Sequence, residues 1–185
     1  MDIEFKNSKK PVNYEKALKL LEKRVNEVKK GGRELVWFLE HPTTYTAGIR
    51  YKKEEILDKS INIVKTNRGG KITLHNPGQK IVYFVLDLNR RKKNIRNLVR
   101  EIENIIVEFL KVYKIKSYAD KKNIGIWVNK KKIAAIFLFL NHIPIFFLSA
   151  LEFILYNFKN SIIIFSICFT RFLIFFFLLF KLITK

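Results

Sequence analysis

The segment that decides the fold is RGGKITLHNPGQ, residues 68–79. Two glycines are followed by an alternating strand pattern and then by a Pro77-Gly78 turn. Gly69 and Gly70 tolerate positive φ and close backbone approach, so their amide N–H groups can face a ligand carbonyl or another oxygen. The pattern therefore predicts a loop, a short strand and a sharp return of the chain.

Two interpretations of this segment remain open from spacing alone. In the first, it is a hairpin that needs glycine at two turns, with Arg68 in a surface ion pair. In the second, it binds a ligand, and Arg68 fixes the loop or an anionic group. Thr73 and His75 alternate onto the same side of the predicted strand, which suits either interpretation.

The flanking sequence predicts two helices and several strands. Apolar residues recur at helical spacing over residues 13–30, with Asn13 as N-cap and Gly31-Gly32 as stop, and again from Asn94 to Leu110. Strands are predicted at residues 35–39, 61–66, 72–75, 81–88, 124–128 and 133–138, and a loop at residues 43–50. The strand connections are too short for a purely parallel sheet, so the predicted fold class is α/β with a mixed sheet.

Composition limits the classes of function. The chain has 185 residues and a formal net charge of +20, enough length for one domain with its own core. The bias toward Lys, Ile, Asn and Phe is typical of an AT-rich gene, so the charge alone does not indicate nucleic acid, and an acidic carrier protein suits it equally. The three histidines lack ligand spacing, so no metal site is predicted. With one cysteine, Cys168, and no N-terminal leader pattern, a cytoplasmic location is expected.

Three separated motifs carry a resemblance to a known family. They are EHPTTYTAG at residues 40–48, the segment at 68–79, and GIWV at 125–128 followed by KIAAI at 132–136. In this order and spacing the chain closely resembles lipoyl(octanoyl) transferases from about residue 35 to residue 136. The resemblance implies a biotin/lipoate protein ligase-like fold. Residues 1–136 would then form the N-terminal part of an octanoyltransferase-like catalytic domain, incomplete in this chain.

The resemblance also implies an acyltransferase. Such an enzyme takes an octanoyl or lipoyl group from acyl carrier protein, holds it as a cysteine thioester, and passes it to a lysine of a lipoyl domain. The lipoyl domains are those of 2-oxoacid dehydrogenase complexes and the glycine cleavage H protein, and neither ATP nor another cofactor is needed. The substrate-binding residues implied are Arg68, Gly69, Gly70, Lys71, Ile72, Thr73, Leu74, His75, Ala135, Ile136 and Phe137.

By the same resemblance, Lys132 lowers the pKa of the nucleophilic thiol. The thiolate is the nucleophile, and a free thiol has a pKa near 8.5. A neighbouring ammonium stabilises the thiolate by Coulomb attraction and therefore lowers this pKa. The plainer interpretation is that Lys130, Lys131 and Lys132 coat an exposed hairpin. Cys168 lies about as far past Lys132 as the family nucleophile would, but it lacks the flanking Pro and Gly. A cysteine in such an apolar segment is usually an inert hydrophobe with a raised pKa.

The family pattern is lost at Phe137, where the family carries glycine. A phenyl ring there would fill space meant for substrate or backbone. Smaller departures are Leu74, where the family prefers an aromatic residue, and Asn76, which replaces a glycine but tolerates left-handed backbone. Residues 137–185 are therefore expected to be a hydrophobic tail that forms apolar helix.

The tail has two explanations. Residues 133–151 contain no charged side chain and residues 161–180 contain only Arg171, so both approach the ~20 apolar residues that span a bilayer. A reading-frame shift in an AT-rich gene is the leading hypothesis and would leave the chain truncated and inactive. The alternative is a basic, membrane-associated, non-enzymatic protein with two apolar helices. Asn141, His142, Pro144 and Arg171 weigh against it, because polar groups in lipid are costly.

Overall fold

The computed structural model describes residues 2–90, 94–120, 122–138 and 145–150. Its backbone contacts divide the chain into two compact units. The larger unit is formed by residues 2–93 and 137–149, and the smaller unit by residues 94–136 with residue 1 and residues 150–185. Each unit has its own helix and strands, so each is described separately.

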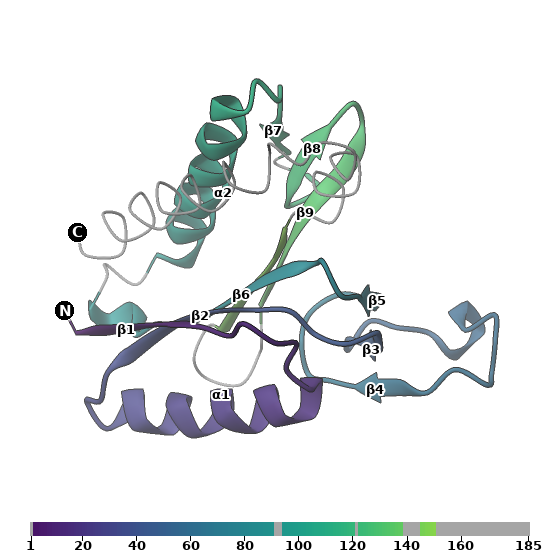
Figure 1. The fold of residues 1–185 in the computed structure, drawn as a ribbon, viewed down its shortest axis with the longest axis horizontal. Helices are drawn as coiled ribbons and strands as arrows, with labels where there is room; N and C mark the ends of the chain where they lie inside the picture. Colours follow the sequence, from purple (N-terminus) through teal and green to yellow (C-terminus); the bar gives the residue numbers. More distant parts are fainter. Residues whose placement is uncertain (1, 91–93, 121, 139–144, 151–185) are drawn as a thin grey trace. The chain divides into compact units, whose positions relative to one another are not determined.

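The larger unit is a helix packed on a sheet. Its strands run in the order β1 (Ile3–Asn7), β2 (Glu34–Leu39), β6 (Lys80–Val85) and β10 (Ile145–Ala150). Strand β1 is parallel to β2, and β2 is antiparallel to β6. Every residue of β2 is buried, as its continuous apolar run predicts. Helix α1 (Tyr14–Lys29) lies along one face of this sheet (Figure 1).

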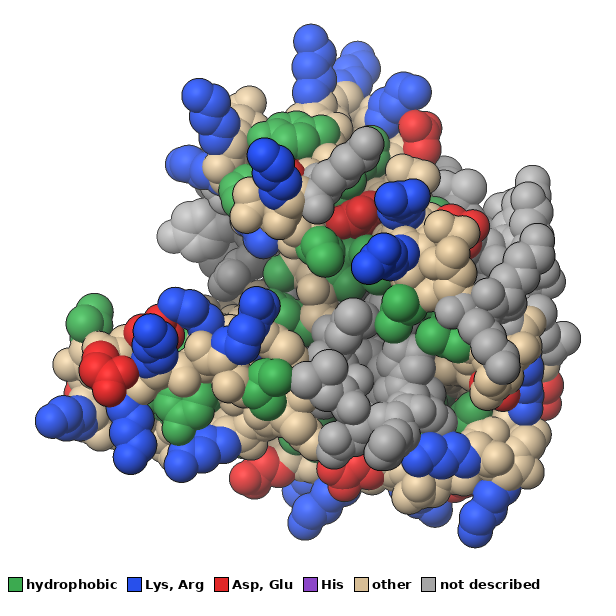
Figure 2. Space-filling view, turned by 180° about the vertical axis from the view of Figure 1, so that it is seen from behind, with side chains coloured by type: hydrophobic (Ala, Val, Ile, Leu, Met, Phe, Trp, Pro, Cys, Tyr) green, Lys and Arg blue, Asp and Glu red, His purple; other side chains and the backbone are tan. Residues whose placement is uncertain are grey.

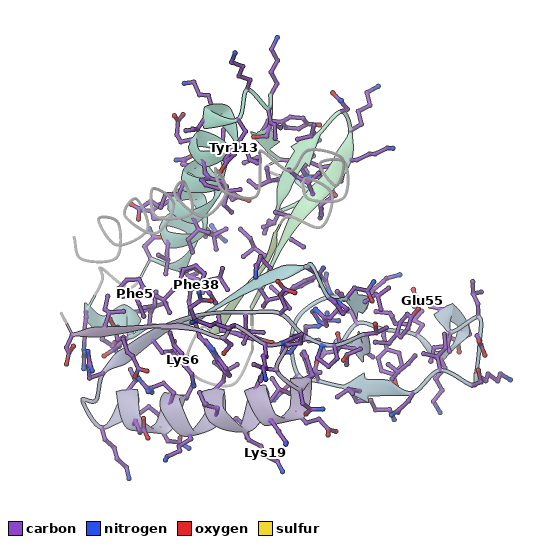
Figure 3. All side chains as sticks on the ribbon, in the orientation of Figure 1. Phe5, Lys6, Lys19, Phe38, Glu55 and Tyr113 are labelled. Atoms are coloured by element: carbon purple, nitrogen blue, oxygen red, sulfur yellow. The ribbon has the colours of Figure 1, made fainter. Side chains whose placement is uncertain are left out.

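Helix α1 begins and ends where its sequence predicts. The Asn13 side chain accepts a hydrogen bond from the Lys16 N–H at 3.1 Å, and Gly31 follows the last turn with φ +89°. Lys19 points away from the sheet (Figure 3). The buried face of α1 packs against β2 and β6 through Tyr14, Ala17, Leu21, Val25 and Val28.

A second, three-stranded sheet of the larger unit has the order β4 (Ile63–Lys65), β3 (Thr44–Ala47), β5 (Ile72–His75). The prediction of a loop at residues 43–50 is wrong for β3. Its polar sequence has no apolar alternation, and it is a strand because both neighbours pair with it, β4 in parallel and β5 antiparallel. The connection from β3 to β4 contains the short helix η1 (Lys53–Glu55) and extends away from the main sheet (Figure 1).

The smaller unit contains α2 (Ile95–Val112), the strands β7 (Tyr118–Ala119) and β8 (Ile126–Val128), and residues 131–136 of β9 (Lys131–Leu138), whose last two residues belong to the larger unit. Asn94 caps α2 by accepting from the Asn97 N–H at 3.1 Å. Strands β8 and β9 form the predicted antiparallel pair. Their connection is shorter than expected, because Asn129 and Lys130 alone make the turn, both with positive φ.

Several elements were not predicted. Strands β1 and β7 are too short and too polar to stand out, and η2 (Leu88–Arg90) is a single turn. The expectation of apolar helix is wrong at residues 145–150, where β10 is a strand rich in phenylalanine. The other tail residues predicted to be helical, and Cys168, lie outside the described residues. Among the described helices, none has the length and apolar character needed to cross a bilayer.

Candidate functional site

The first two sequence motifs are joined in the larger unit. Strand β3 pairs with β5 from Thr44 opposite His75 to Ala47 opposite Ile72. Beyond the strand ends, the Gly48 N–H donates to the Lys71 carbonyl at 3.0 Å and the Ile49 N–H donates to the Arg68 carbonyl at 3.0 Å. We call residues 68–71 the glycine loop. It is held along its length by the backbone that follows β3.

Glycine is required where these two motifs touch. A Cβ at Gly48 would lie 2.5 Å from the Gly70 carbonyl oxygen and 2.8 Å from the Arg68 Nη1, closer than such atoms can approach. Gly70 itself has φ +91°, a backbone conformation that favours glycine. Gly48, at the end of the first motif, is therefore needed so that the glycine loop of the second motif can approach. The spacing of the motifs in the sequence did not reveal this contact.

Arg68 fixes the glycine loop from inside. Its side chain is buried, with 1% exposed. Nη2 donates to the Thr46 carbonyl at 3.0 Å and to the Thr46 hydroxyl at 2.8 Å, and Nη1 donates to the Gly69 carbonyl at 3.0 Å. The interpretation of Arg68 as a surface ion pair is therefore wrong, and its role in fixing the loop is confirmed.

The charge of Arg68 is left without a compensating anion in the described part of the chain, where no carboxylate pairs with it. Burial lowers the pKa of its guanidinium, while nearby Tyr14 and Tyr83 raise it. Its Nε has no hydrogen-bond partner among the described residues. A buried cation with a free donor is destabilising unless something binds it. The loop is thus chemically suited to an anion or a polarised carbonyl oxygen.

Two histidines lie behind the loop. His41 donates from Nδ1 to the Val12 carbonyl at 2.5 Å, so its Nε2 accepts from the Tyr83 hydroxyl at 2.7 Å. The Nδ1 of His75 lies 3.3 Å from the Gln79 side-chain oxygen. The two imidazole rings are 5.5 Å apart. The structure therefore brings together two histidines that the sequence separates.

Both histidines are neutral at physiological pH. Burial lowers the pKa of His41 to about 4, opposed by its bond to the Val12 carbonyl. Burial, with the charges of His41 and Arg68, lowers the pKa of His75 to about 4. His41, which precedes a proline and suggested only a turn, is fully buried. Neutral histidines add no further positive charge beside Arg68.

Tyr14 completes this buried polar cluster. Its ring contacts His41 at 5.0 Å and His75 at 5.4 Å between centroids. Its hydroxyl lies near Arg68, but it has no hydrogen-bond partner of ordinary geometry among the described residues. Burial raises the pKa of Tyr14 to about 12, so the hydroxyl stays protonated and can donate. Sequence analysis assigned Tyr14 only to the buried face of a helix.

The remaining predicted substrate-binding residues of the larger unit line the loop and β5. Ile72, Thr73 and Leu74 are half-buried. Lys71 is exposed and forms an ion pair with Glu55 of η1, whose side chain is labelled in Figure 3. Because Lys71 already has a carboxylate partner, Arg68 is the better candidate to bind an anionic or carbonyl group.

Phe137 covers the glycine loop. The Arg68 guanidinium carbon lies 4.8 Å from the centroid of the Phe137 ring. The Phe137 Cε1 lies 3.2 Å from the position that a Cβ of Gly70 would take. The sequence predicts that a phenyl ring here fills space meant for substrate or backbone, and the structure places the ring against the backbone of the glycine loop.

The third motif forms the hairpin of the smaller unit. Lys132 is exposed, and its Nζ donates to the Ile124 carbonyl at 3.0 Å and lies 5.0 Å above the Trp127 ring. Buried Glu103 of α2 accepts from the Gly125 N–H at 3.1 Å, and burial raises the pKa of Glu103. The hairpin is thus fixed to α2, and it holds Lys132 at the surface of this unit.

The structure brings some predicted site residues together and leaves others untested. Residues 68–75 and Phe137 belong to the larger unit, whereas Lys132, Ala135 and Ile136 belong to the smaller one. Their assignment to one site stays a prediction, as does the role of Cys168. Within the described residues, no group of three metal-binding side chains is present.

Sequence comparisons identify similar proteins. Residues 13–142 match the family model described as the lipoyl protein ligase A/B catalytic domain. An octanoyltransferase of Anaplasma phagocytophilum is 44% identical over 142 residues, which cover 73% of this chain and 68% of that protein. An octanoyltransferase of Ehrlichia chaffeensis is 44% identical over 140 residues, covering 72% of this chain and 65% of that protein. The chain thus spans about two thirds of the length of these relatives.

Structural comparisons identify the fold. A candidate lipoate protein ligase from T. acidophilum, solved with bound lipoic acid, has a TM-score of 0.58 at 13% identity and covers 85% of this chain and 71% of its own. A lipoate-protein ligase A bound with ATP has a TM-score of 0.57 at 13% identity, covering 85% and 70%. The mixed α/β arrangement is therefore that of lipoate protein ligases, as the sequence predicts.

Proposed function

Because this chain belongs to the family of lipoyl protein ligase A/B catalytic domains, and within it to the octanoyltransferases, we propose that it transfers an octanoyl or lipoyl group during protein lipoylation. The proposed donor is an acyl carrier protein and the proposed acceptor is a lysine of a lipoyl domain. Octanoyltransferases are acyltransferases, so the chemistry is the exchange of a thioester for an amide.

The observation that carries this proposal is the buried, uncompensated Arg68 behind the glycine loop. A thioester carbonyl develops negative charge when it is attacked, and preorganised donors stabilise that charge best where water is excluded. Arg68 Nε and the Tyr14 hydroxyl lie close to each other, and neither has a hydrogen-bond partner of ordinary geometry among the described residues, so we propose them as such donors. The half-buried apolar side chains of Ile72 and Leu74 would contact the acyl chain.

In the proposed reaction, a thiolate attacks the carbonyl carbon of the octanoyl thioester. The bond from that carbon to the sulfur of the carrier breaks, and the carrier thiol leaves with a proton. The lysine amine of the lipoyl domain then attacks the acyl-enzyme, an amide forms, and the enzyme thiol is released. Lys132 would stabilise the thiolate by Coulomb attraction, since its ammonium is exposed and can be approached.

Cys168 is the one cysteine in the sequence and therefore the one candidate for this thiol. The segment around it lacks the Pro and Gly of the family turn, which argues for weak reactivity. Incubation of the purified chain with labelled octanoyl-carrier protein tests its role. A hydroxylamine-sensitive label that Cys168→Ser removes would assign the nucleophile, and labelling that survives Cys168→Ser would exclude it.

The proposed partners are acidic or carry acidic surfaces. The first 132 residues carry about +17 of the net charge of +20, and Lys and Arg side chains are spread widely over the face shown in Figure 2. Carrier binding is therefore expected to weaken steeply with salt. A cytoplasmic location is proposed together with this reaction, since a reactive thiol needs a reducing compartment.

The direct test of the function is acyl transfer by the full chain. Octanoyl-carrier protein and a lipoyl domain are incubated with it, and the mass of the lipoyl domain is measured. We expect the chain to bind octanoyl-carrier protein through Arg68, and a chain with a working nucleophile to add one octanoyl group to the acceptor lysine. Failure to bind octanoyl-carrier protein would contradict the proposal, whereas binding without modification of the lipoyl domain would show that this chain is inactive, as the frame-shift hypothesis predicts.

A further inference from the structure

We propose that the smaller unit carries the docking surface for the acidic acyl carrier protein, an inference that rests on the proposed acyl transfer. This surface belongs to a different unit from the glycine loop, which would bind the acyl group itself. We call it the β7 face, and its residues are Lys114, Lys116, Tyr118, Lys122 and Ile124.

The positive charge of the smaller unit is concentrated in one segment. Residues 111–132 contain eight basic residues and one acidic residue, a net charge of +7. Residues 94–110, which include most of α2, contain two basic and three acidic residues, a net charge of −1. Figure 2 shows Lys and Arg side chains beside hydrophobic ones on this unit. A general lysine bias would raise the charge of both segments, so composition alone does not explain the difference.

The lysines of the β7 face are available to a partner. Lys114, Lys116 and Lys122 are exposed, and within the part of the chain that the structure describes they form no ion pair. The acidic residue of the segment, Asp120, accepts from the backbone N–H groups of Lys122 at 2.7 Å and Asn123 at 3.2 Å. Its carboxylate therefore shapes the turn between β7 and β8, and the three ammonium groups are left for carboxylates of another molecule.

Apolar side chains are exposed among these lysines. Tyr118 is 47% exposed and Ile124 is 52% exposed. From residue 114 to residue 118 exposed and half-buried positions alternate, so Lys114, Lys116 and Tyr118 point outward together. Exposed apolar and aromatic residues within a charged rim are typical of protein interfaces. This mixture favours an acidic protein over a nucleic acid, whose phosphates would leave Ile124 without an apolar contact.

The β7 face is continuous with Lys132. Tyr118 lies opposite Trp127 in the β7–β8 pair, and Trp127 lies opposite Lys132 in the β8–β9 pair. Residues paired directly across neighbouring strands share one face of the sheet. Lys132 Nζ also donates to the Ile124 carbonyl at 3.0 Å and lies 5.0 Å from the centroid of the Trp127 ring. A carrier bound to the β7 face therefore lies beside the lysine that is proposed to stabilise the attacking thiolate.

The experiment is a titration of the full chain with fluorescently labelled octanoyl-carrier protein at low and at high salt. Lys116→Glu combined with Lys122→Glu should weaken binding about tenfold at low salt, because two attractions become repulsions. Lys16→Glu combined with Lys19→Glu is the matched control, since it makes the same charge change at exposed positions of α1. This control should weaken binding by less than about threefold. High salt should reduce the difference between the two pairs.

A second set of measurements separates docking from acyl binding. The variant with both β7-face substitutions should bind free octanoate as the unmodified chain does, and it should lose affinity equally for carrier protein without an octanoyl group. Tyr118→Ser should weaken carrier binding about three- to tenfold at high salt as well, because salt does not screen an apolar contact. Leu57→Ser, at a position of the larger unit that is 97% exposed, is its control and should have no effect.

Several results would overturn the inference. If the α1 pair weakens carrier binding as much as the β7-face pair, the attraction depends only on total charge. If neither pair changes it, the carrier docks elsewhere, and in both cases the proposed function survives. If the β7-face pair removes binding of duplex DNA but not of carrier, the surface binds nucleic acid. If the unmodified chain binds no carrier, both proposals fail.

A milder variant covers the case in which the charge-reversed chain does not fold. Lys116→Ser combined with Lys122→Ser removes the two charges without introducing carboxylates. It should weaken carrier binding in the same direction by a smaller factor, about threefold. Unchanged carrier binding by this variant would overturn the inference in the same way.

Discussion

The glycine loop of the larger unit and the Lys132 hairpin of the smaller unit are built in opposite ways. Arg68 is 1% exposed and makes three hydrogen bonds to Thr46 and Gly69. Lys132 is exposed, and its ammonium donates a hydrogen bond to the carbonyl of Ile124, just before β8. The difference fits the two proposed roles, because charge on an acyl carbonyl is best stabilised by preorganised buried donors, whereas a thiolate is stabilised by a cation that the thiol can approach.

The largest expected effect is the loss of octanoyl transfer when Lys132 of the hairpin is replaced. Lys132→Met should lower the rate of octanoyl transfer by about 10²- to 10⁴-fold, because the thiolate loses its neighbouring cation. Stability should change by less than about 0.5 kcal/mol, since the side chain is exposed. Lys130→Met, in the same hairpin, is the control and should transfer normally. Equal losses in both variants would contradict a specific role of Lys132.

The second prediction concerns how the stability of the two units depends on pH. The pKa values of His41 and His75 are lowered to about 4 by burial, so the unfolded chain binds more protons between pH 6.5 and 4. The contribution of the two neutral histidines to the free energy of unfolding is fully present above pH 6.5 and is lost as the pH falls toward 4. Near pH 5 the loss is on the order of 2 kcal/mol for each histidine.

The smaller unit should respond to pH differently. The raised pKa of Glu103 stabilises it at low pH, and this contribution is lost as the pH rises through that pKa. Hydrogen exchange read separately for the two units, together with denaturant titrations, measures both effects. His75→Gln should roughly halve the acid dependence of the larger unit. A larger unit that keeps its stability at pH 5 would show that the histidines are not buried as neutral rings.

A third test separates binding from stability in the larger unit. Arg68→Met should weaken octanoate binding by about 10- to 100-fold, which corresponds to the loss of one or two charge-assisted hydrogen bonds. Stability should change little, because removing a buried cation without a counter-ion offsets the lost bonds to Thr46. Calorimetry and denaturant titration measure the two quantities. Unchanged binding with large destabilisation would make Arg68 purely structural.

The smallest effect concerns the contact between two motifs. Gly48→Ala should destabilise the larger unit by about 1–3 kcal/mol, because its Cβ would lie 2.5 Å from the Gly70 oxygen. Gly31→Ala is the control, since a Cβ there meets no atom within 4 Å and only its φ of +89° is strained. Thermal unfolding compares them. Equal melting temperatures for the two variants would show that the loop can move away from β3.

Sequence patterns predicted the elements that are determined by their own residues. The apolar run of residues 35–39 and the helical periods of α1 and α2 fix their own structure, and Asn13 and Asn94 mark the helix starts. Strand β3 escaped prediction because its pairing partners lie far along the chain.

The candidate site divides in the same way. Its glycines and Arg68 were found from the motif, because turn chemistry is visible in sequence. The roles of Tyr14 and His41 were not, since a buried polar cluster is assembled by packing between a helix, a loop and a strand. Phe137 was recognised as a departure from the family pattern, and its contact with Arg68 became visible only in three dimensions.

The central claim is that the glycine loop grips the acyl chain, and photoaffinity labelling tests it most directly. The full chain is irradiated with an octanoate analogue that carries a diazirine at its end, and the labelled peptides are identified by mass spectrometry. The account predicts labels in residues 68–75 and at Phe137, which unmodified octanoate competes away and Arg68→Met abolishes. Labels confined to other segments, or unaffected by Arg68→Met, would contradict it.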